Sequence, residues 1–288
     1  MIITVSISVL FGMDGPKAWP ARHHCAEMRG GFGGRLQIVV VIVDKTDGSR
    51  GIGCGFPANL ARSRISNWQD KMAEIIMVRH GQAQTGAKDE TSYDNLSDLG
   101  HQQARWLGEY LGADHAFDRV VTGKMRRQMQ TGLSMGLDGV DYQTDARLNE
   151  MDYFGLAGVL ENSHGLAAPT SQLEFQTHVA EVLGAWSRAE VGDDLESYAD
   201  FRGRVLGAVR DIAGAEDRVI VVSSTGVIAT LMAVALDLDI RRKSEVFLRI
   251  AHTSVHKFEM VGEDLHLLQF CATPHLDLPE RVHARTLI

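Results

Sequence analysis

Hydrophobic residues follow two alternating patterns from about residue 72 onward. Short continuous apolar runs, typical of strands covered on both faces of a sheet, occur in EIIMVR and DRVIVVSS. Other segments place apolar residues three or four positions apart, as on one face of a helix. The runs predict strands at about 74–79, in DRVVTG, in DRVIVVSS, and late in VFLRIAHTSVHKFEM and DLHLLQF. The periodic segments predict helices in LSDLGHQQARWLGEYLG, KMRRQMQTGLSM and GVIATLMAVALDL, and at roughly 171–190 and 198–213.

The alternation of strands and helices indicates an α/β fold. Because the apolar strands need cover on both sides, we expect a three-layer sandwich: a mostly parallel central sheet covered by helices on both faces. Ser97 is the predicted N-cap of its helix. In the helix of KMRRQMQTGLSM, Met125, Met129 and Leu133 fall on one side, which predicts that this side belongs to the core.

The first 71 residues differ from the rest of the chain. They carry 9 Lys and Arg against 5 Asp and Glu, whereas the remaining residues carry 20 against 32, and they include Gly-rich stretches such as RGGFGG. The loop GIGCG is not followed by a helix, and His23-His24-Cys25 has no partner ligands at useful spacing. We therefore interpret residues 1–71 as a weakly structured appendage, produced by an upstream translation start, and residues 72–288 as the functional domain.

Composition and charge narrow the function. The 288 residues carry a net charge of −8, which argues against nucleic acid or a membrane surface as partner, because both recruit Lys and Arg. The three cysteines lack metal-ligand spacing and are typical of free thiols in a reducing compartment. The apolar stretch at 2–11 is about half as long as a membrane span. It also lacks the basic start of a signal peptide, since no Lys or Arg precedes Lys17. We expect a cytoplasmic protein.

An arginine, a histidine and a glycine end the first predicted strand. Open α/β sheets bind ligands at the carboxyl ends of their strands, where Arg79-His80-Gly81 would lie. Arginine offers a bidentate fork to an anion, histidine can act as base or nucleophile, and glycine lets the backbone approach a ligand closely. Three residues alone are also compatible with an ordinary loop histidine, so the rest of the chain must decide.

Six segments in order resemble the histidine phosphatase superfamily, the phosphoglycerate mutase-like group: IIMVRHGQA, LSDLGHQQA, VTGKMRRQMQT, RLNEMDYFG, SYADFRGRV and VIVVSSTGVIA. The resemblance covers residues 73 to about 260. It implies that His80 is a nucleophile that forms a phosphohistidine, and that Arg79 binds the phosphoryl oxygens. It also implies a second phosphate-binding arginine at Arg127, rather than Arg126, and a general acid at Glu150. No metal and no cofactor are implied.

The chemistry of phosphoryl transfer fits these residue types. The transferring group spreads negative charge over its oxygens, so catalysis consists mostly of positioning and charge stabilisation, which two guanidinium groups can supply. The leaving alkoxide needs a proton, which Glu150 can give before it activates water in the second half-reaction. Glu161, in contrast, is interpreted as a solvated carboxylate.

One position departs from the family pattern. The resemblance implies a second histidine at the end of the late buried strand, where this chain has Ser224, followed by Thr225. A hydroxyl can donate a hydrogen bond but carries no charge, and loss of such a donor commonly costs a few kcal/mol of transition-state stabilisation. Ser224 and Thr225 are therefore candidate site residues. His252, His256 and His275 could supply a replacement imidazole; His275 is preferred because it follows a predicted strand end, whereas His252 and His256 would share a strand face.

Two classes of function remain. The first is a metal-independent phosphomonoesterase that acts through phosphohistidine on a small phosphate ester. The second is a catalytically weakened relative that binds a phosphorylated ligand or partner without turnover; a phosphoglycerate mutase is a less favoured alternative. Joint retention of the nucleophile and the acid favours the enzyme. Substrate choice is expected to reside in loops at 83–95 and 150–170, which contain no recognisable motif.

Overall fold

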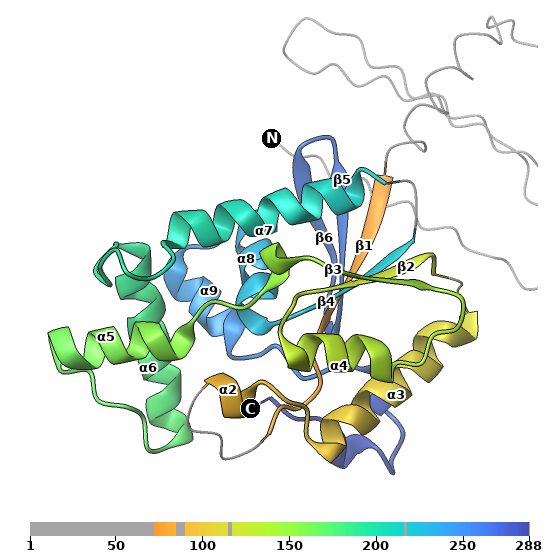
Figure 1. Cartoon of the computed structure of the whole chain (residues 1–288), viewed down its shortest axis with the longest axis horizontal. Helices are drawn as coiled ribbons and strands as arrows, with labels where there is room; N and C mark the ends of the chain where they lie inside the picture. Colours follow the sequence, from red (N-terminus) through yellow and green to blue (C-terminus); the bar gives the residue numbers. More distant parts are fainter. Residues whose placement is uncertain (1–71, 85–89, 115–116, 216–217, 288) are drawn as a thin grey trace, which may run out of the picture. The chain divides into compact units, whose positions relative to one another are not determined.

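The computed structural model describes residues 72–84, 90–114, 117–215 and 218–287, so the expected appendage at 1–71 lies outside the described residues. Its sheet has six strands: β1 Met72–Arg79, β2 Arg119–Thr122, β3 Asp141–Thr144, β4 Val219–Ser223, β5 Val255–Val261 and β6 Asp264–Ala272. Their order is β3-β2-β4-β1-β5-β6 (Figure 1). The first four in that order run parallel, and β5 and β6 are antiparallel. The sheet is mostly parallel, as predicted.

Eight α-helices surround the sheet in the described part of the chain: α2 Glu90–Tyr93, α3 Asp98–Asp114, α4 Arg126–Ser134, α5 Tyr153–His164, α6 Gln172–Ser187, α7 Tyr198–Ala213, α8 Thr225–Ala235 and α9 Ile240–Phe247. Three 3-10 turns are η1 Ala146–Leu148, η2 Pro274–Leu276 and η3 Val282–Ala284. Helices α3 and α4 lie on one side of the sheet, and α7 and α8 lie on the other (Figure 1). This is the expected three-layer sandwich.

Alternate side chains of the central strands supply two separate cores. In β1, Ile75 and Met77 join the larger core with helices α5 to α9, whereas Ile76 and Val78 join the smaller core against α3. Strand β4 divides in the same way and is buried throughout. A strand covered on both faces favours apolar side chains at successive positions, which explains the continuous hydrophobic runs.

Two expected elements are different in the structure. Residues 246–254 are not strand: Val246 and Phe247 end α9, a turn follows, and β5 begins only at Val255. The segment 150–170, expected as a loop, contains helix α5, which begins at a capping carboxylate, Asp152, and ends at Gly165 in the left-handed conformation. Short β3 and helix α9 were not predicted at all.

The buried side of α4 is also different from the prediction. It consists of Arg127, Gln128, Thr131 and Gly132, while Leu133 is 65% exposed. Met125 and Met129 are only half-buried. The prediction that the Met125–Leu133 side is core was wrong, because the inward side of this helix serves a polar region rather than the apolar core.

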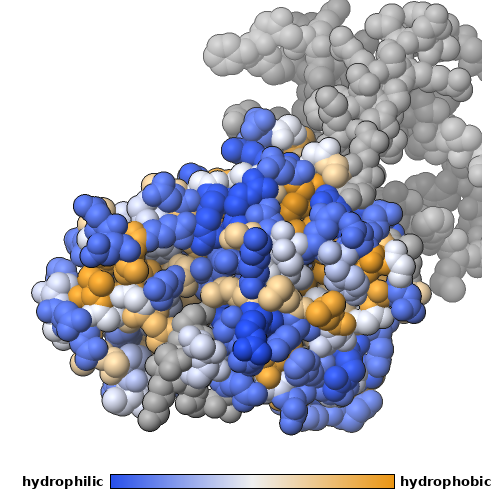
Figure 2. All heavy atoms as spheres, in the orientation of Figure 1, coloured by the Kyte–Doolittle hydropathy of each residue, from blue (hydrophilic) through white to orange (hydrophobic). Residues whose placement is uncertain are grey.

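The face of the domain seen in Figure 2 is largely hydrophilic, with apolar residues in small separate areas. None of the described helices is long and apolar enough to cross a membrane. Ser97 acts as the predicted N-cap of α3, since its hydroxyl accepts the Gly100 N–H at 3.0 Å.

Candidate active site

The carboxyl ends of β1 and β4 meet at one edge of the sheet. Arg79 is paired with Ser223 in the register of these parallel strands, and the His80 N–H donates to the Ser223 carbonyl at 2.9 Å. The two expected sources of site residues, Arg79-His80 and Ser224-Thr225, are therefore brought side by side. This is the edge at which open α/β sheets bind ligands.

The imidazole of His80 is fixed in one tautomer. Its Nδ1 lies 2.8 Å from the Gly81 carbonyl, which can only accept, so Nδ1 carries the hydrogen and Nε2 keeps its lone pair. Burial, reinforced by Arg127 and Arg79, holds the pKa of His80 well below its usual value. His80 is thus a neutral imidazole with a free lone pair on Nε2 at neutral pH.

Glycine is required at position 81 for a different reason from the one expected. A Cβ at this residue would lie 2.5 Å from the Gly100 carbonyl oxygen, so glycine is required for close contact with the start of α3 rather than with a ligand. The Gly81 N–H donates to Thr131 Oγ1 at 3.0 Å, and that hydroxyl donates to the Arg127 carbonyl at 2.7 Å. These bonds link the His80 loop to α4.

Arg79 is buried and held by backbone carbonyls. Its Nη1 donates to Ile250 O at 2.5 Å and to Leu287 O at 2.6 Å, while its Nε has no hydrogen-bond partner. Burial lowers the pKa of Arg79, and interactions with Tyr93 and Glu150 oppose this effect. The carbonyl from residue 287 was not foreseen, because sequence gives no local signal for a contact across 208 positions.

Arg127 lies in the first turn of α4, and its side chain is almost fully buried. Its Nη1 pairs with Asp94 Oδ1 at 3.1 Å, and its guanidinium lies 5.0 Å from the centre of the Tyr93 ring. Asp94 also accepts the backbone N–H groups of Arg126 and Arg127, so it caps α4 from a distant segment. Arg126 is exposed, which agrees with the choice of Arg127.

Two site residues of this group, Tyr93 and Asp94, were missed by sequence reasoning. Tyr93 ends the short helix α2 and Asp94 follows it, and the four residues of this helix leave no periodic pattern. The contact between Asp94 and the start of α4 at Arg126 and Arg127 joins two segments far apart in sequence, so it could be predicted only once the fold was known.

Glu150 is held by backbone donors. Its Oε2 accepts the Gly226 N–H at 2.8 Å and its Oε1 accepts the Met151 N–H at 3.0 Å. Gly226 is in the first turn of α8, where the helix dipole favours a carboxylate. A Cβ on Gly226 would lie 2.3 Å from Glu150 Oε1, so this glycine makes room for the carboxylate.

Ser224 and Thr225 lie at the junction of β4 and α8 and are both buried. Ser224 Oγ accepts a hydrogen bond from Gln128 Nε2 at 2.7 Å. Gln128, on the inward side of α4, thus binds Ser224, the residue at the position where the family resemblance implies a histidine.

The three candidate replacement histidines occupy different places. The His252 ring lies 5.8 Å from the His80 ring, centre to centre. His256 is in β5, with both ring nitrogens hydrogen-bonded, to Ser254 Oγ and Cys271 N. His275, in η2, contacts Thr253 Oγ1 through Nε2 at 2.9 Å, and no ring contact joins it to His80 among the described residues. Of the three, His252 is the one whose ring contacts the His80 ring, and it lies in a turn before β5 rather than on a strand face with His256.

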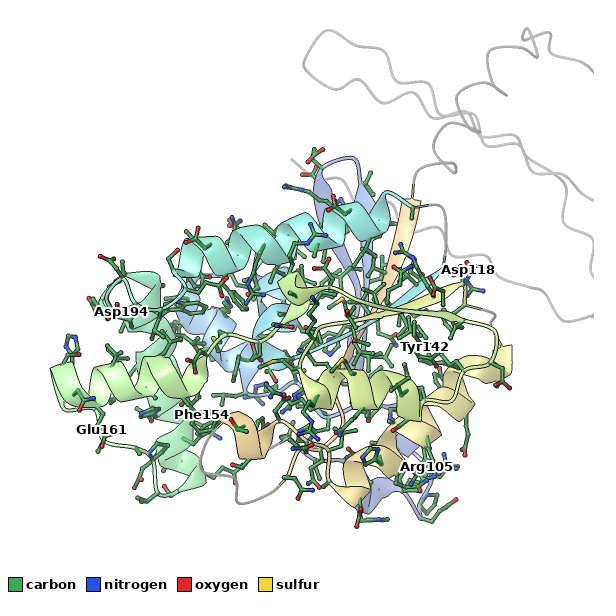
Figure 3. All side chains as sticks on the ribbon, in the orientation of Figure 1. Arg105, Asp118, Tyr142, Phe154, Glu161 and Asp194 are labelled. Atoms are coloured by element: carbon green, nitrogen blue, oxygen red, sulfur yellow. The ribbon has the colours of Figure 1, made fainter. Side chains whose placement is uncertain are left out.

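An aromatic wall leads outward from His80. Tyr93 lies edge-on to His80 with ring centres 6.5 Å apart, and Phe154 of α5 lies edge-on to Tyr93 at 6.5 Å. In Figure 3, Phe154 extends from the end of α5 that faces α2, whereas Glu161 is near the other end of that helix. Glu161 is exposed, as expected for a solvated carboxylate.

The arrangement can bind and attack a phosphoryl group. Two buried guanidinium groups flank a neutral imidazole, and one carboxylate, Glu150, interacts with Arg79. Across the described residues, no three His, Cys, Asp or Glu side chains gather as metal ligands would. Such a site favours a dianion with planar or tetrahedral oxygens.

Comparison with known proteins places this geometry in context. The sequence profile of the histidine phosphatase superfamily (branch 1) matches residues 75–273. A glucosyl-3-phosphoglycerate phosphatase from Mycolicibacterium vanbaalenii is 27% identical over 59% of this chain and 77% of its own length. The phosphoglycerate mutase-like protein 4 of Arabidopsis thaliana is 25% identical over 73% of this chain and 89% of its own.

Solved structures show the same fold. A phosphoglycerate mutase from Bacillus anthracis aligns with a TM-score of 0.54 at 16% identity, over 73% of this chain and 97% of its own. A phosphoserine phosphatase from Entamoeba histolytica aligns with a TM-score of 0.53 at 16% identity, over 70% and 98%. Since the profile match runs from the middle of β1 to just beyond β6 and includes His80, Arg127 and Glu150, the chain belongs to the histidine phosphatase superfamily (branch 1).

Proposed function

We propose that this protein is a phosphomonoesterase that works through a phosphohistidine on His80 and needs no metal ion. The observation that carries the proposal is the state of His80: its Nδ1–H is held by the Gly81 carbonyl, its Nε2 lone pair is free, and its pKa is lowered by burial and by two arginines. An imidazole kept neutral beside two cations is suited to attack an anionic phosphorus centre.

In the proposed first half-reaction, His80 Nε2 forms a bond to phosphorus in line with the breaking ester bond. Arg79 and Arg127 stabilise the charge that spreads over the phosphoryl oxygens. Glu150 enters this step in its protonated form and donates that proton to the leaving oxygen, which leaves it as a carboxylate. In the second half-reaction the Glu150 carboxylate removes a proton from water, which attacks the phosphohistidine and releases phosphate and free His80.

The substrate is proposed to be a small phosphate ester. The similar proteins include a glucosyl-3-phosphoglycerate phosphatase, a phosphoglycerate mutase and a phosphoserine phosphatase bound to phosphoserine, so their names point to small phosphate esters but not to one compound. In this chain the aromatic wall beside His80 consists of Tyr93 and of Phe154 of α5, which is 40% exposed. An ester with an apolar or flat group next to the phosphate would match this wall better than a highly charged one.

One alternative has support in the sequence. Ser224 stands where the family resemblance implies a charged donor, which favours a weakened relative that binds phosphorylated ligands without turnover. Such a binder would use Arg79 and Arg127 but would gain nothing from the positioned acid Glu150. The enzyme is therefore the better proposal.

The test is hydrolysis of an aryl phosphate in excess chelator. We expect turnover by the full chain, loss of at least about 10³-fold in kcat for His80→Ala, and no change for His266→Ala, an exposed histidine on β6. Full activity of a folded His80→Ala variant would contradict the proposal. Loss of wild-type activity on chelation, with recovery on adding a divalent metal, would contradict its metal independence.

A further inference from the structure

A second imidazole lies against the nucleophile. The His252 ring is 5.8 Å from the His80 ring, is tilted by 49° to it, and is only 1% exposed. Its Nε2 is buried and has no hydrogen-bond partner. A buried polar atom without a partner calls for an explanation, and an absent ligand is one of the common explanations.

Gln103 and Thr286 contact the side of the His252 ring that carries Nδ1, and their hydrogen bonds favour one tautomer. Gln103 Oε1 accepts the Gln82 N–H at 2.8 Å, so the other end of this amide is Nε2, which donates to Ala284 O and to Thr286 Oγ1. The Thr286 hydroxyl, which accepts from Gln103, lies 2.8 Å from His252 Nδ1, and donation of its one hydrogen to that nitrogen satisfies both groups. With Nδ1 as the acceptor, the hydrogen of His252 is on Nε2, the atom without a partner.

His256 already uses both of its ring nitrogens, and the same reasoning excludes His275. Thr253 Oγ1 donates to the His252 carbonyl at 2.7 Å, so it can only accept from His275 Nε2. His275 therefore uses its single N–H inside the protein, and its unpartnered Nδ1 is a bare lone pair. A neutral imidazole in that state cannot donate to a phosphoryl oxygen.

Resting on the proposed phosphatase function, we propose that His252 Nε2–H donates a hydrogen bond to an oxygen of the phosphoryl group carried by His80. His252 thereby supplies from the α9–β5 turn the donor that Ser224 cannot supply as an imidazole from the β4–α8 junction. No covalent bond is made or broken at His252: the hydrogen bond strengthens as charge accumulates on the phosphoryl oxygens. Thr286 and Gln103 are positioning residues that keep the Nε2–H tautomer.

The backbone around His252 supports this placement. The His252 N–H donates to the Thr286 carbonyl at 2.9 Å, and the Thr253 N–H donates to the Arg79 carbonyl at 3.1 Å. The segment that carries His252 is thus bonded both to the strand end that carries the nucleophile and to residues 284–287. Because Leu287 also holds Arg79, one short segment positions two groups that would meet the phosphoryl oxygens.

The test compares His252→Ala with His275→Ala, a matched control in which a buried imidazole of the same region is removed. We expect His252→Ala to slow phosphoenzyme formation by about 10²-fold or more, in the range for loss of one preorganised donor, and His275→Ala to stay within about threefold once folding is verified by circular dichroism. Thr286→Val should slow the reaction and Thr286→Ser should restore it, which a purely structural role of the methyl group would not produce. Equal rates for wild type and folded His252→Ala would overturn the proposal.

Two further measurements separate this proposal from the proposed function. Binding of orthovanadate, a phosphate mimic, needs no turnover: we expect His252→Ala to weaken it at least about tenfold, while His275→Ala binds as wild type does. If the wild type binds vanadate through His252 but hydrolyses no ester, the proposed phosphatase function is refuted while the proposed hydrogen bond from His252 stands. If His252→Ala does not fold, the ¹⁵N shifts of His252 in the wild type decide, since a hydrogen on Nδ1 instead of Nε2 would overturn the proposal.

Discussion

Substitution of Gly226 by alanine tests the role of Glu150 without touching the carboxylate. The new Cβ would lie 2.3 Å from Glu150 Oε1, whereas ordinary contacts of this kind begin at about 3.4 Å. The carboxylate must therefore retreat by about 1 Å, and it must also weaken its bond to the Gly226 N–H. The helix itself gains, because alanine is favoured over glycine by up to about 1 kcal/mol in helices.

The magnitude follows from the displacement. A catalytic group misplaced by about 1 Å commonly loses about 10²-fold in rate, which corresponds to about 2.7 kcal/mol of transition-state stabilisation. The loss should depend on the leaving group, because an alkoxide needs the proton from Glu150 and a dinitrophenolate does not. We expect Gly226→Ala to lose about 10²-fold on alkyl phosphates and less than about threefold on dinitrophenyl phosphate when phosphoenzyme formation is measured.

The assay is a series of phosphate esters with leaving groups of rising pKa, measured by stopped flow for wild type and Gly226→Ala. Gly203→Ala on α7 is the matched control, since a Cβ there would meet no atom within 4 Å. A uniform loss across all esters would indicate that Gly226 serves phosphate binding rather than proton donation. Wild-type rates on alkyl phosphates would refute the assignment of Glu150 as the acid.

Three further predictions concern the rest of the chain. Burial lowers the pKa of Lys243 to about 7, against about 10.5 for an ordinary lysine. Between pH 7 and pH 10.5 the unfolded chain therefore binds one more proton than the folded chain, so the free energy of unfolding rises with pH in this range. Lys243→Met should therefore be more stable by roughly 2–4 kcal/mol at pH 7, with the advantage shrinking towards pH 10; urea unfolding with no pH-dependent difference would contradict this. Ser224→His should not accelerate turnover, because His252 already supplies the donor and Gln128 occupies the contact with Ser224, and a rise of about 10²-fold would indicate a decayed site instead. Since the family match begins at residue 75, removal of residues 1–71 should leave Tm and kcat unchanged, and loss of folded protein would refute the interpretation of that segment as an appendage.

The sequence predicted what depends on local pattern. Continuous apolar runs identified β1 and β4, because strands buried on both faces favour apolar side chains at successive positions. The place of Arg79-His80 at a strand end, and of Arg127 rather than Arg126 inward on α4, also came from short motifs. These features depend on residues that are close in sequence.

The remainder of the site depends on contacts between distant segments. Asp94 caps α4 from 33 positions away, and the carbonyl of Leu287 holds Arg79 across 208 positions. Such bonds leave no periodic signal. The position of His252 has the same origin: the predicted strand over VFLRIAHTSVHKFEM is interrupted by the end of α9 and a turn, and this turn brings the imidazole against His80.

The central claim is that the phosphoryl group is carried by His80. It is tested most directly by mixing the full chain with a rapidly cleaved aryl phosphate, quenching in alkali, where phosphohistidine survives, and locating the added phosphoryl group by mass spectrometry of the peptides. We predict one phosphoryl group on the peptide that contains His80, bonded at Nε2, because Nδ1 is occupied by the Gly81 carbonyl. Hydrolysis with the label on another residue, or with no phosphorylated protein at any time before the steady state, would contradict the account.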